Sequence, residues 1–486
     1  MNHFTPSALP DEGSGCLYLF QLIDRAVPDY FAPDRPVVVA RAPGRLDVLG
    51  GFADYSGSLV LQLPLAEAAC VAVQERDDEL LCVWSPTRED TRSQVVKWSL
   101  RDLGTRDQHT DLKVASMLLR ADPRDRWTTY VLGCLLILCE AKGVRPEHGF
   151  SLLLRSDVPE GVGVASSAAI EVATMRALAA FYGIELLGRE LALLCQRVEN
   201  EIAGAPCGVM DQMTAACGKQ DQLLALRCQP CELEGSVALP ADIEVIGIDS
   251  GVRHANTESS YGDVRAAAAM GQRMLLDLRS VRVRVDAGLR WGADDPWKGY
   301  LANCDAGEFR SRWEEQLPTS LLGAEFLQRF GGHGDVHAKV DAARHYPVRA
   351  ATRHPVEENG RAARFRELLL QPEPLGAREH AVLGDLMLAS HSSYAACGLG
   401  HATTDFLIEQ VRSRRERGAA VYGARVTGGG AGGTIAMIGK RVAVWHESLR
   451  IKKALLEATG HSATIFRYSS AGAMPFGVIR LDPKKS

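Results

Sequence analysis

The sequence lacks the features that place a protein in a membrane or an oxidising compartment. No apolar run approaches the ~18 residues that cross a bilayer. The longest candidate, residues 131–139, is about half that length. The N-terminal residues have no basic start followed by an apolar stretch, so we expect no signal peptide. We therefore expect a cytoplasmic protein with no membrane partner, whose 12 cysteines are reduced thiols.

An excess of charge of one sign and a paired cysteine motif are also missing. The 55 Lys and Arg against 60 Asp and Glu leave a net charge of −5. That value is too small to attract a nucleic acid through bulk charge. Cys228 and Cys231 form one CxxC motif without a second pair, which disfavours a zinc site. Hydrophobic residues make up 46% and charged residues 24% of the chain, which disfavours extensive disorder.

The chain instead contains strand and helix patterns mixed along 486 residues, enough for about two or three domains. Short β-branched runs predict strands at residues 37–40 and 58–63 with a loop between them. Helical patterns cover residues 127–142 and 188–202, and a strand, glycine turn and strand are expected at 423–439. This mixture predicts the α+β class.

The first of three glycine-rich segments covers residues 159–173. Gly161 and Gly163 let the backbone approach a bulky anion, and Ser166 and Ser167 open a helix. The free N–H groups and positive dipole end of a helix start suit phosphate, and serine hydroxyls there can also bind Mg²⁺. No Lys follows the glycines, so this is not the GK[ST] type of phosphate loop. The alternative is an ordinary strand–turn–helix with a serine N-cap.

The second segment, residues 41–57, places Arg41, Arg45, Asp47 and Asp54 among four glycines. Two cations and two carboxylates in one tight loop suit recognition of a polyol and a phosphate. The alternative is a solvated turn.

The third segment has five glycines in the six residues 428–433. Such a run is costly in a plain hairpin, so it favours close approach of the backbone to a ligand or a helix. A flexible hairpin is the alternative. Between the segments, Asp211 lies in an otherwise apolar context, where a carboxylate is either paired or altered in its proton affinity.

Together these segments resemble the GHMP kinase superfamily, and in particular its galactokinase branch. The three family motifs occur in order at residues 42–55, 159–169 and 423–433. The similarity extends to further segments, namely 126–131, 198–212, 249–261 and 390–398. The resemblance implies a two-lobed α+β fold. A ribosomal S5-like N-terminal lobe, residues 1–235, would bind ATP and sugar, and residues 236–486 would form a C-terminal α/β lobe.

Within that branch the second segment departs from the galactokinase pattern. Galactokinases have Gly-Glu-His-Thr-Asp-Tyr where this chain has Gly-Gly-Phe-Ala-Asp-Tyr at residues 50–55. In the family, that Glu and His reach the outer part of the hexose, including its hydroxymethyl group. L-Arabinose has the ring stereochemistry of galactose without that group. Loss of the polar pair therefore favours the pentose, with Phe52 filling part of the vacated volume.

Residues 44–64, 348–359 and 390–400 are also similar to the L-arabinokinases of plants. The resemblance therefore implies ATP- and Mg²⁺-dependent phosphorylation of L-arabinose at its anomeric hydroxyl, giving β-L-arabinose 1-phosphate and ADP. Two alternatives stay open. One is a sugar 1-kinase acting on galactose, a uronic acid or a heptose, and the other is a non-catalytic sensor of sugar and ATP. The sequence leaves open whether the chain is a monomer or a dimer.

The resemblance also implies roles for single residues in catalysis and phosphate binding. Asp211 would face the anomeric hydroxyl, as a base or as an orienting carboxylate, with Arg45 beside it. Mg²⁺ would bind Ser167 and Glu199. The phosphates would lie in the backbone cradle of Gly161, Val162, Gly163, Val164, Ala165, Ser166 and Ser167.

Further matches concern the adenine and the sugar. Trp127 and Tyr130 correspond to aromatic positions near the adenine. Asp54, Gly208 and Tyr261 correspond to sugar contacts. Asp47, in place of the usual Asn, would either touch the sugar or only fix its loop.

Overall fold

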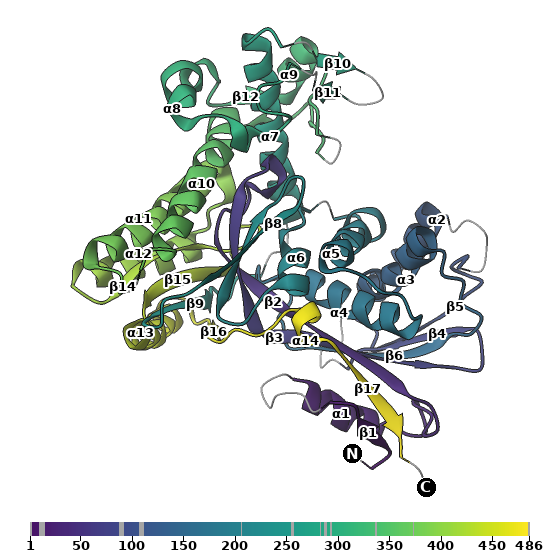
Figure 1. The fold of residues 1–486 in the computed structure, drawn as a ribbon. Helices are drawn as coiled ribbons and strands as arrows, with labels where there is room; N and C mark the ends of the chain where they lie inside the picture. Colours follow the sequence, from purple (N-terminus) through teal and green to yellow (C-terminus); the bar gives the residue numbers. More distant parts are fainter. Residues whose placement is uncertain are drawn as a thin grey trace.

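Figure 1 shows a computed structural model that contains two main sheets, one larger than the other. The structure describes residues 2–8, 15–86, 92–105, 111–205, 207–253, 257–281, 283–285, 289–291, 294–335, 338–372 and 374–484. The larger, nine-stranded sheet has the order β1-β17-β2-β3-β6-β4-β5, with β7 and β8 attached at β3. The four-stranded sheet has the order β14-β15-β9-β16. The α+β class predicted from the sequence is confirmed.

The strands have the following bounds. Those of the larger sheet are β1 (Phe4–Pro6), β2 (Val37–Leu49), β3 (Leu59–Glu75), β4 (Leu80–Trp84), β5 (Val95–Ser99), β6 (Phe150–Ser156), β7 (Gln222–Arg227), β8 (Glu232–Ala238) and β17 (Val478–Pro483). Those of the smaller sheet are β9 (Ile243–Asp249), β14 (Val421–Val426), β15 (Thr434–Lys440) and β16 (Ile465–Phe466). Two short pairs are β10 (Val283–Val285) with β11 (Leu289–Trp291), and β12 (Leu321–Leu322) with β13 (His345–Tyr346).

The α-helices surround these sheets. They are α1 (Cys16–Arg25), α2 (Leu112–Leu119), α3 (Thr129–Lys142), α4 (Ser166–Phe181), α5 (Gly188–Arg197), α6 (Met210–Cys217), α7 (Thr257–Leu278), α8 (Ala306–Glu308), α9 (Gly323–Phe330), α10 (Val348–Leu369), α11 (Ala377–Tyr394), α12 (Ala402–Glu416), α13 (Arg441–Thr459) and α14 (Ala473–Phe476). None of the described helices is long and apolar enough to cross a lipid bilayer.

The larger sheet is apolar on both faces because its strands alternate between two cores. On β3, Val71 and Val73 face the main core, which includes α3 and α4, whereas Cys70 and Ala72 face α1 on the other side. In Figure 1, α1 accordingly lies on the opposite side of the sheet from α3 and α4. Burial of both faces explains why these strands appear in the sequence as continuous apolar runs.

We expected a loop between residues 40 and 58, and this prediction is wrong for most of that segment. Strand β2 continues from Val37 to Leu49 and pairs with β3, with register shifts at Pro43/Arg45 and at Asp47/Leu49. Bulges of this kind let a strand carry Pro and Gly and turn side chains toward a site. The second glycine-rich segment is therefore mostly a buried strand, and the solvated-turn alternative is wrong.

The smaller sheet joins the larger one through the main core. Ile246 and Ile248 of β9 pack toward α12 and α13, whereas Ile243 and Val245 face the main core. The last strand, β17, returns to pair with β2 in the larger sheet. We propose that the boundary between the two lobes lies near residue 235. Strand β17 is then a C-terminal addition to the first lobe.

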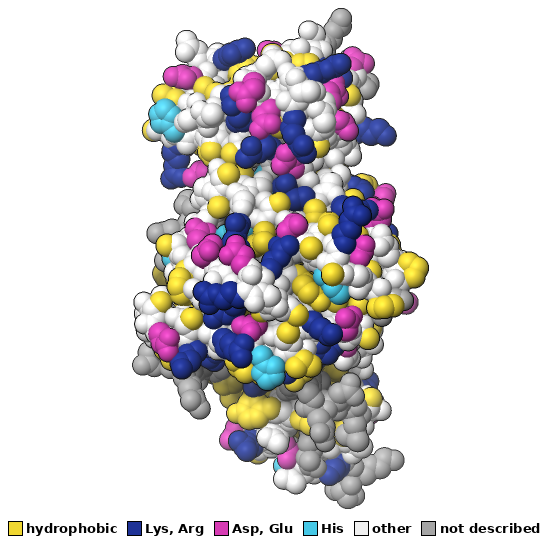
Figure 2. All heavy atoms as spheres, turned by 90° about the vertical axis from the view of Figure 1, so that its left-hand side faces the viewer, with side chains coloured by type: hydrophobic (Ala, Val, Ile, Leu, Met, Phe, Trp, Pro, Cys, Tyr) yellow, Lys and Arg dark blue, Asp and Glu magenta, His cyan; other side chains and the backbone are white. Residues whose placement is uncertain are grey.

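One face of the molecule shows how charge is distributed around the smaller sheet. In Figure 2, Lys and Arg side chains lie among Asp and Glu side chains across this face. Ion pairs link the helices there, for example Arg415 to Asp385 at 2.7 Å and Arg414 to Glu447 at 3.0 Å. The two signs of charge therefore largely offset each other at short range on this face.

Helix α11 approaches β14 through two glycines. A Cβ on Gly384 would lie 1.7 Å from the carbonyl oxygen of Tyr422, and one on Gly423 would lie 2.3 Å from that of Gly384. We expect Gly384→Ala to lower the free energy of unfolding by about 1–3 kcal/mol, because the methyl group overpacks this contact. Urea unfolding measures the change.

The control for this prediction is Gly360→Ala on the exposed side of α10. A Cβ there meets nothing within 4 Å, so the substitution should raise the free energy of unfolding by about 0.5–1 kcal/mol. Changes of the same sign in both variants would contradict the proposed contact.

Candidate active site

A cavity of about 200 Å³ lies where the predicted segments meet. The residues that line it come from β2 and the turn after it, from the segment before α6, from α7, and from the glycine turn between β14 and β15. The lining residues are Arg45, Phe52, Asp54, Glu199, Ala205, Cys207, Gly208, Met210, Asp211, Tyr261, Gly428 and Gly429. The structure thus brings together residues that are up to about 380 positions apart in the sequence.

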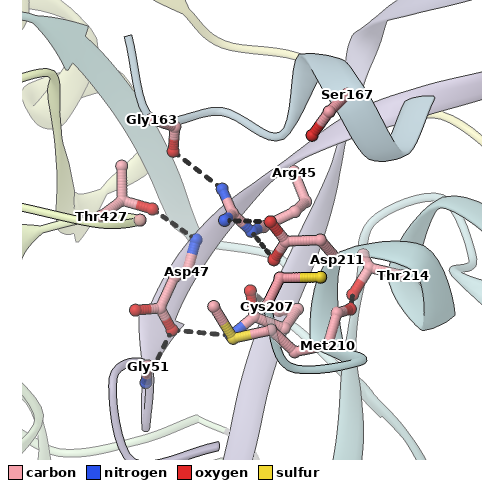
Figure 3. A network of polar contacts seen from close by, with 12 residues as sticks. Arg45, Asp47, Gly51, Gly163, Ser167, Cys207, Met210, Asp211, Thr214 and Thr427 are labelled. Atoms are coloured by element: carbon pink, nitrogen blue, oxygen red, sulfur yellow. Dashed lines mark hydrogen bonds and ion pairs between the residues drawn. The ribbon is translucent and has the colours of Figure 1, made fainter. Parts of the chain in front are cut away.

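Arg45 links the cavity to the glycine loop before α4 (Figure 3). Its Nε and Nη2 donate to the two carboxylate oxygens of Asp211 at 2.8 and 2.7 Å, and its Nη1 donates to the carbonyl oxygen of Gly163 at 2.8 Å. The Arg45 side chain is 3% exposed and that of Asp211 is 25% exposed. A bidentate pair fixes both side chains, and leaves one side of the carboxylate open to the cavity.

The glycine loop holds the backbone in left-handed conformations at three positions. The φ angles are 74° at Gly161, 76° at Gly163 and 61° at Ala165. Ala165 is the N-cap of α4 and offers no side-chain acceptor. The alternative of a serine N-cap is therefore wrong, and the first N–H groups of α4 are left for an external acceptor.

The third glycine segment packs against this loop. A Cβ on Gly428 would lie 2.5 Å from the carbonyl oxygen of Gly163. Thr434 donates from Oγ1 to the carbonyl oxygen of Val162 at 2.8 Å. We expected the backbone to approach a ligand or a helix closely; at Gly428 it approaches the glycine loop before α4 instead.

Ser167 and Glu199 lie together beside the start of α4. Ser167 Oγ donates to Glu199 Oε1 at 2.9 Å, and Gln212 Nε2 donates to Glu199 Oε2 at 2.7 Å. Glu199 belongs to a π-helical segment, η4 (Val198–Ala203), that continues α5. Burial and, to a smaller extent, the charge of Asp211 raise the pKa of Glu199 to about 7, against the opposing effect of the hydrogen bond from Ser167.

This donor pair fits Mg²⁺. No group of three or more His, Cys, Asp or Glu side chains is gathered as a metal site within the described ranges. Mg²⁺ commonly takes one or two protein ligands and completes its octahedral shell with phosphate oxygens and water. A carboxylate and a hydroxyl next to a phosphate-binding helix start match that requirement.

The expected sugar contacts also come together. Tyr261 donates from its hydroxyl to Asp54 Oδ1 at 3.4 Å. A Cβ on Gly208 would lie 1.6 Å from Asp54 Oδ2, so a side chain at that position would displace the carboxylate. Burial raises the pKa of Asp54 to about 6, although the nearby Arg265 lowers it; the charge of Asp211 raises it.

Phe52 forms an apolar wall of the cavity. It is 1% exposed and has a φ of 64°, unusual for a bulky residue. Its ring makes edge contacts with Tyr261 at 4.9 Å and with Tyr55 and Tyr394 at 5.5 Å between ring centres.

Asp47 and Arg41 make internal contacts and do not line the cavity. Asp47 Oδ2 accepts from Arg425 at 2.5 Å and Oδ1 accepts from Gln62 at 2.6 Å. Of the two roles left open for Asp47, the geometry favours fixing the loop. Arg41 donates to the carbonyl oxygen of Ala66 and to Ser470 Oγ, so its expected part in polyol or phosphate recognition is wrong.

A second cavity of about 460 Å³ lies on the outer side of the glycine loop. Ser85, Arg92, Ser156, Val158 and Ile170 contribute to its lining. Trp127 and Tyr130 do not line it. Trp127 instead lies behind Arg92, whose guanidinium carbon is 4.9 Å from the ring centre, and donates from Nε1 to the carbonyl oxygen of Ser93.

Two polar residues that shape the site were not predicted from the sequence. Gln212, next to Asp211, also donates to Glu171 Oε2 at 3.2 Å, and so connects Glu199 to a second buried carboxyl. Arg265 lies one helical turn after Tyr261 on α7 and pairs with Asp335 at 2.5 Å. The spacing of four residues from Tyr261 is the signal that places Arg265 on the same helix face.

Comparisons with known proteins agree with this geometry. Residues 129–219 match the family described as "GHMP kinases N terminal domain", and residues 29–75 match the "Galactokinase galactose-binding signature". Among solved structures, the galactokinase of Lactococcus lactis complexed with galactose has a TM-score of 0.70 at 20% identity, over 94% of this chain and 99% of that one. The Methanococcus jannaschii mevalonate kinase has a TM-score of 0.53 at 13% identity, over 89% and 98%.

Two curated relatives have higher identity. An L-arabinokinase of Arabidopsis thaliana is 38% identical over 94% of this chain, and this chain spans 48% of that protein's length. A galactokinase of Roseiflexus sp. (strain RS-1) is 30% identical over 89% of this chain and 90% of its own length.

The raised pKa of Asp54 predicts a gain in stability when its charge is removed. Because the native pKa is about 6 and the ordinary value is 3.8, the native state holds this proton more tightly than the unfolded state, and stability falls as pH rises from about 4 to above 6. Asp54→Asn should therefore raise the free energy of unfolding by about 1–3 kcal/mol at pH 8, and by little near pH 4.

Urea unfolding at the two pH values measures this difference. Asp385→Asn is the matched control, because Asp385 is largely exposed and pairs on the surface with Arg415. An Asp54→Asn variant that is less stable than the wild type at pH 8 would contradict the assignment.

Proposed function

The chain belongs to the galactokinase branch of the GHMP kinase family, as its motifs led us to expect, and we propose that it phosphorylates L-arabinose at the anomeric hydroxyl, using ATP. The products would be β-L-arabinose 1-phosphate and ADP. The observation that carries the choice of sugar is the apolar wall of Phe52, which stands where galactokinases have a Glu-His pair. The 38% identity to the Arabidopsis thaliana L-arabinokinase supports the same choice.

In this proposal Asp211 and Arg45 act on the attacking hydroxyl. The open side of the Asp211 carboxylate accepts the proton of the anomeric hydroxyl, or orients it toward phosphate. Arg45 holds both carboxylate oxygens. Because this guanidinium is buried, its charge also stabilises the negative charge that develops on the sugar oxygen.

The glycine loop and the start of α4 would hold the triphosphate. Backbone N–H groups of residues 161–167 would donate to its oxygens, as at other helix N-termini that bind anions. Ser167 and Glu199 would hold Mg²⁺, which offsets charge on the β- and γ-phosphates when bound. The base would lie in the second cavity, with Trp127 behind Arg92 at its edge, and we keep Tyr130 as a second aromatic residue near the base.

The lining of the first cavity disfavours a uronic acid. Among the described residues that line it, Arg45 is the single cationic side chain, and Asp211 already occupies two of its N–H groups. A sugar carboxylate would therefore face Asp54, Glu199 and Asp211 without a free cation.

We further propose that the kinase works in the cytoplasm, where its 12 cysteines stay reduced.

The test is ADP release with Mg²⁺-ATP against L-arabinose, D-galactose, D-galacturonate, D-glucuronate and a heptose. We expect the highest kcat/KM with L-arabinose. Preference for another sugar would keep the kinase and refute the proposed substrate. Sugar-dependent ATP binding without turnover of any of them would favour the sensor.

The Asp211→Asn variant distinguishes a catalytic kinase from a non-catalytic sensor. The carboxamide keeps the shape but loses the negative charge, so we expect kcat to fall about 100-fold or more. Binding of ATP, measured by calorimetry, should change little. Asp385→Asn is the control and should keep full turnover, since its carboxylate lies on the surface. Retention of most turnover by Asp211→Asn would refute the assigned role.

A further inference from the structure

We propose that a buried network on α10 and α11, centred on His354 and Glu358, sets the sugar selectivity by holding the turn of residues 50–52 against the cavity. This inference rests on the proposed function, because it concerns the same sugar pocket. His354 and Glu358 do not line the cavity. They would be positioning residues that act through Phe52.

The network holds the backbone of the turn directly. Gly50 donates from its N–H to Glu358 Oε1 at 3.1 Å, and Gly51 donates to Asp47 Oδ1 at 3.1 Å. His354 Nε2 lies 3.4 Å from the carbonyl oxygen of Gly51. Three side chains from two separate elements thus fix three consecutive peptide groups.

The two central side chains are themselves held from α11 and α10. Glu358 Oε1 accepts from Ser390 Oγ at 2.5 Å, and its Oε2 accepts from Arg361 Nε at 2.7 Å. His354 Nδ1 lies 3.0 Å from Ser393 Oγ. Although burial raises the pKa of Glu358, Arg361 and other nearby cations lower it to about 2, and burial lowers the pKa of His354 to about 4. The pair is therefore an ionised carboxylate and a neutral ring near pH 7.

The neutral ring matches its two neighbours. A neutral imidazole has one N–H donor and one acceptor nitrogen. The carbonyl of Gly51 requires the donor at Nε2, which leaves Nδ1 to accept from the hydroxyl of Ser393. The tautomer is thus set by the turn on one side and by α11 on the other.

Phe52 depends on this support. With a φ of 64° it occupies a region that a bulky side chain enters only when its surroundings impose it. Its ring also contacts the His354 ring at 5.9 Å between centres. If the turn loosens, Phe52 can relax toward an ordinary conformation and withdraw from the cavity. The cavity would then have room for a hydroxymethyl group.

The same network prevents simple restoration of the galactokinase pattern. A Cβ at residue 51 would lie 1.9 Å from Asp47 Oδ2. Asp47 cannot move freely, because it forms a fully buried ion pair with Arg425. A side chain at 51 therefore requires a change at 47, so the turn and its network work as one unit.

Adjacent glutamates on α10 provide a matched test. Glu357 and Glu358 both pair with Arg361, at 3.0 and 2.7 Å, but it is Glu358 that accepts from Gly50. In Glu358→Gln a single acceptor oxygen must serve donors on opposite sides, so either Gly50 or Arg361 loses its partner. We expect the ratio of kcat/KM for L-arabinose to that for D-galactose to fall roughly fivefold or more, mainly through a higher arabinose KM. The KM for ATP should stay unchanged.

Glu357→Gln should keep the wild-type ratio within about twofold, because Glu357 pairs with Arg310 and Arg361 and not with the turn of residues 50–52. His354→Phe is a second variant that keeps a buried ring and removes the contact to Gly51, and it should lower the ratio in the same way. Thermal melting verifies that each variant is folded. An unchanged ratio in both Glu358→Gln and His354→Phe would overturn the inference, as would an equal loss with both sugars together with a raised KM for ATP.

Hydrogen exchange keeps this test separate from the proposed function. The segment 46–57 should exchange faster in Glu358→Gln than in Glu357→Gln, whichever sugar is used. If the wild type turns over neither sugar, the proposed function fails, and this exchange difference still decides whether Glu358 holds the turn. Equal exchange in the two variants would overturn that contact.

Discussion

The buried guanidinium of Arg45 is the point on which the site depends. It extends from β2 to the carboxylate of Asp211 on α6 and to the carbonyl of Gly163 in the glycine loop. A buried cation is costly unless its donors are satisfied, so a shift of either partner is penalised. The strand, the loop and the helix therefore have one mutual arrangement. The ion pair of Arg425 with Asp47 does the same for β14 and β2, and so fixes where the two sheets meet.

Much of this site could be predicted because its chemistry is carried by long local patterns. Residues 159–173 combine glycines, serines and a helical apolar pattern, and the structure places the start of α4 there. Ser167 also lies against Glu199, and Tyr261 against Asp54, so residues to which the resemblance assigned a shared role are neighbours in the structure. The prediction was weaker for β2, since Pro43, Gly44 and charged residues are typical of a loop. Only burial on both faces and two bulges make that segment a strand.

Other features could not be predicted because they depend on partners far away in the chain. Arg41 and Arg45 are the same residue type in the same short segment. Arg41 nevertheless donates a hydrogen bond to Ser470, whereas Arg45 donates to Asp211. Asp47 is separated by 378 positions from Arg425, the residue with which it pairs outside the cavity. The left-handed backbone of Phe52 has no signal in a residue type that normally avoids it. In each case the conformation or the partner of the residue depends on tertiary contacts, which local sequence propensity does not contain.

The electrostatics of the cavity follow from the same arrangement. Asp54, Glu199 and Asp211 line one small cavity, and the charge of Asp211 adds to the effect of burial in raising the pKa of Asp54 and of Glu199. Arg45 offsets about one of these three charges. On the proposed function the site must nevertheless accept a triphosphate, which such a field repels at short range. A cation held by Ser167 and Glu199 would reverse the sign of that interaction and, at the same time, stabilise the ionised form of Glu199. The carboxylates that destabilise the empty site would thus be the reason that the nucleotide and its metal bind together.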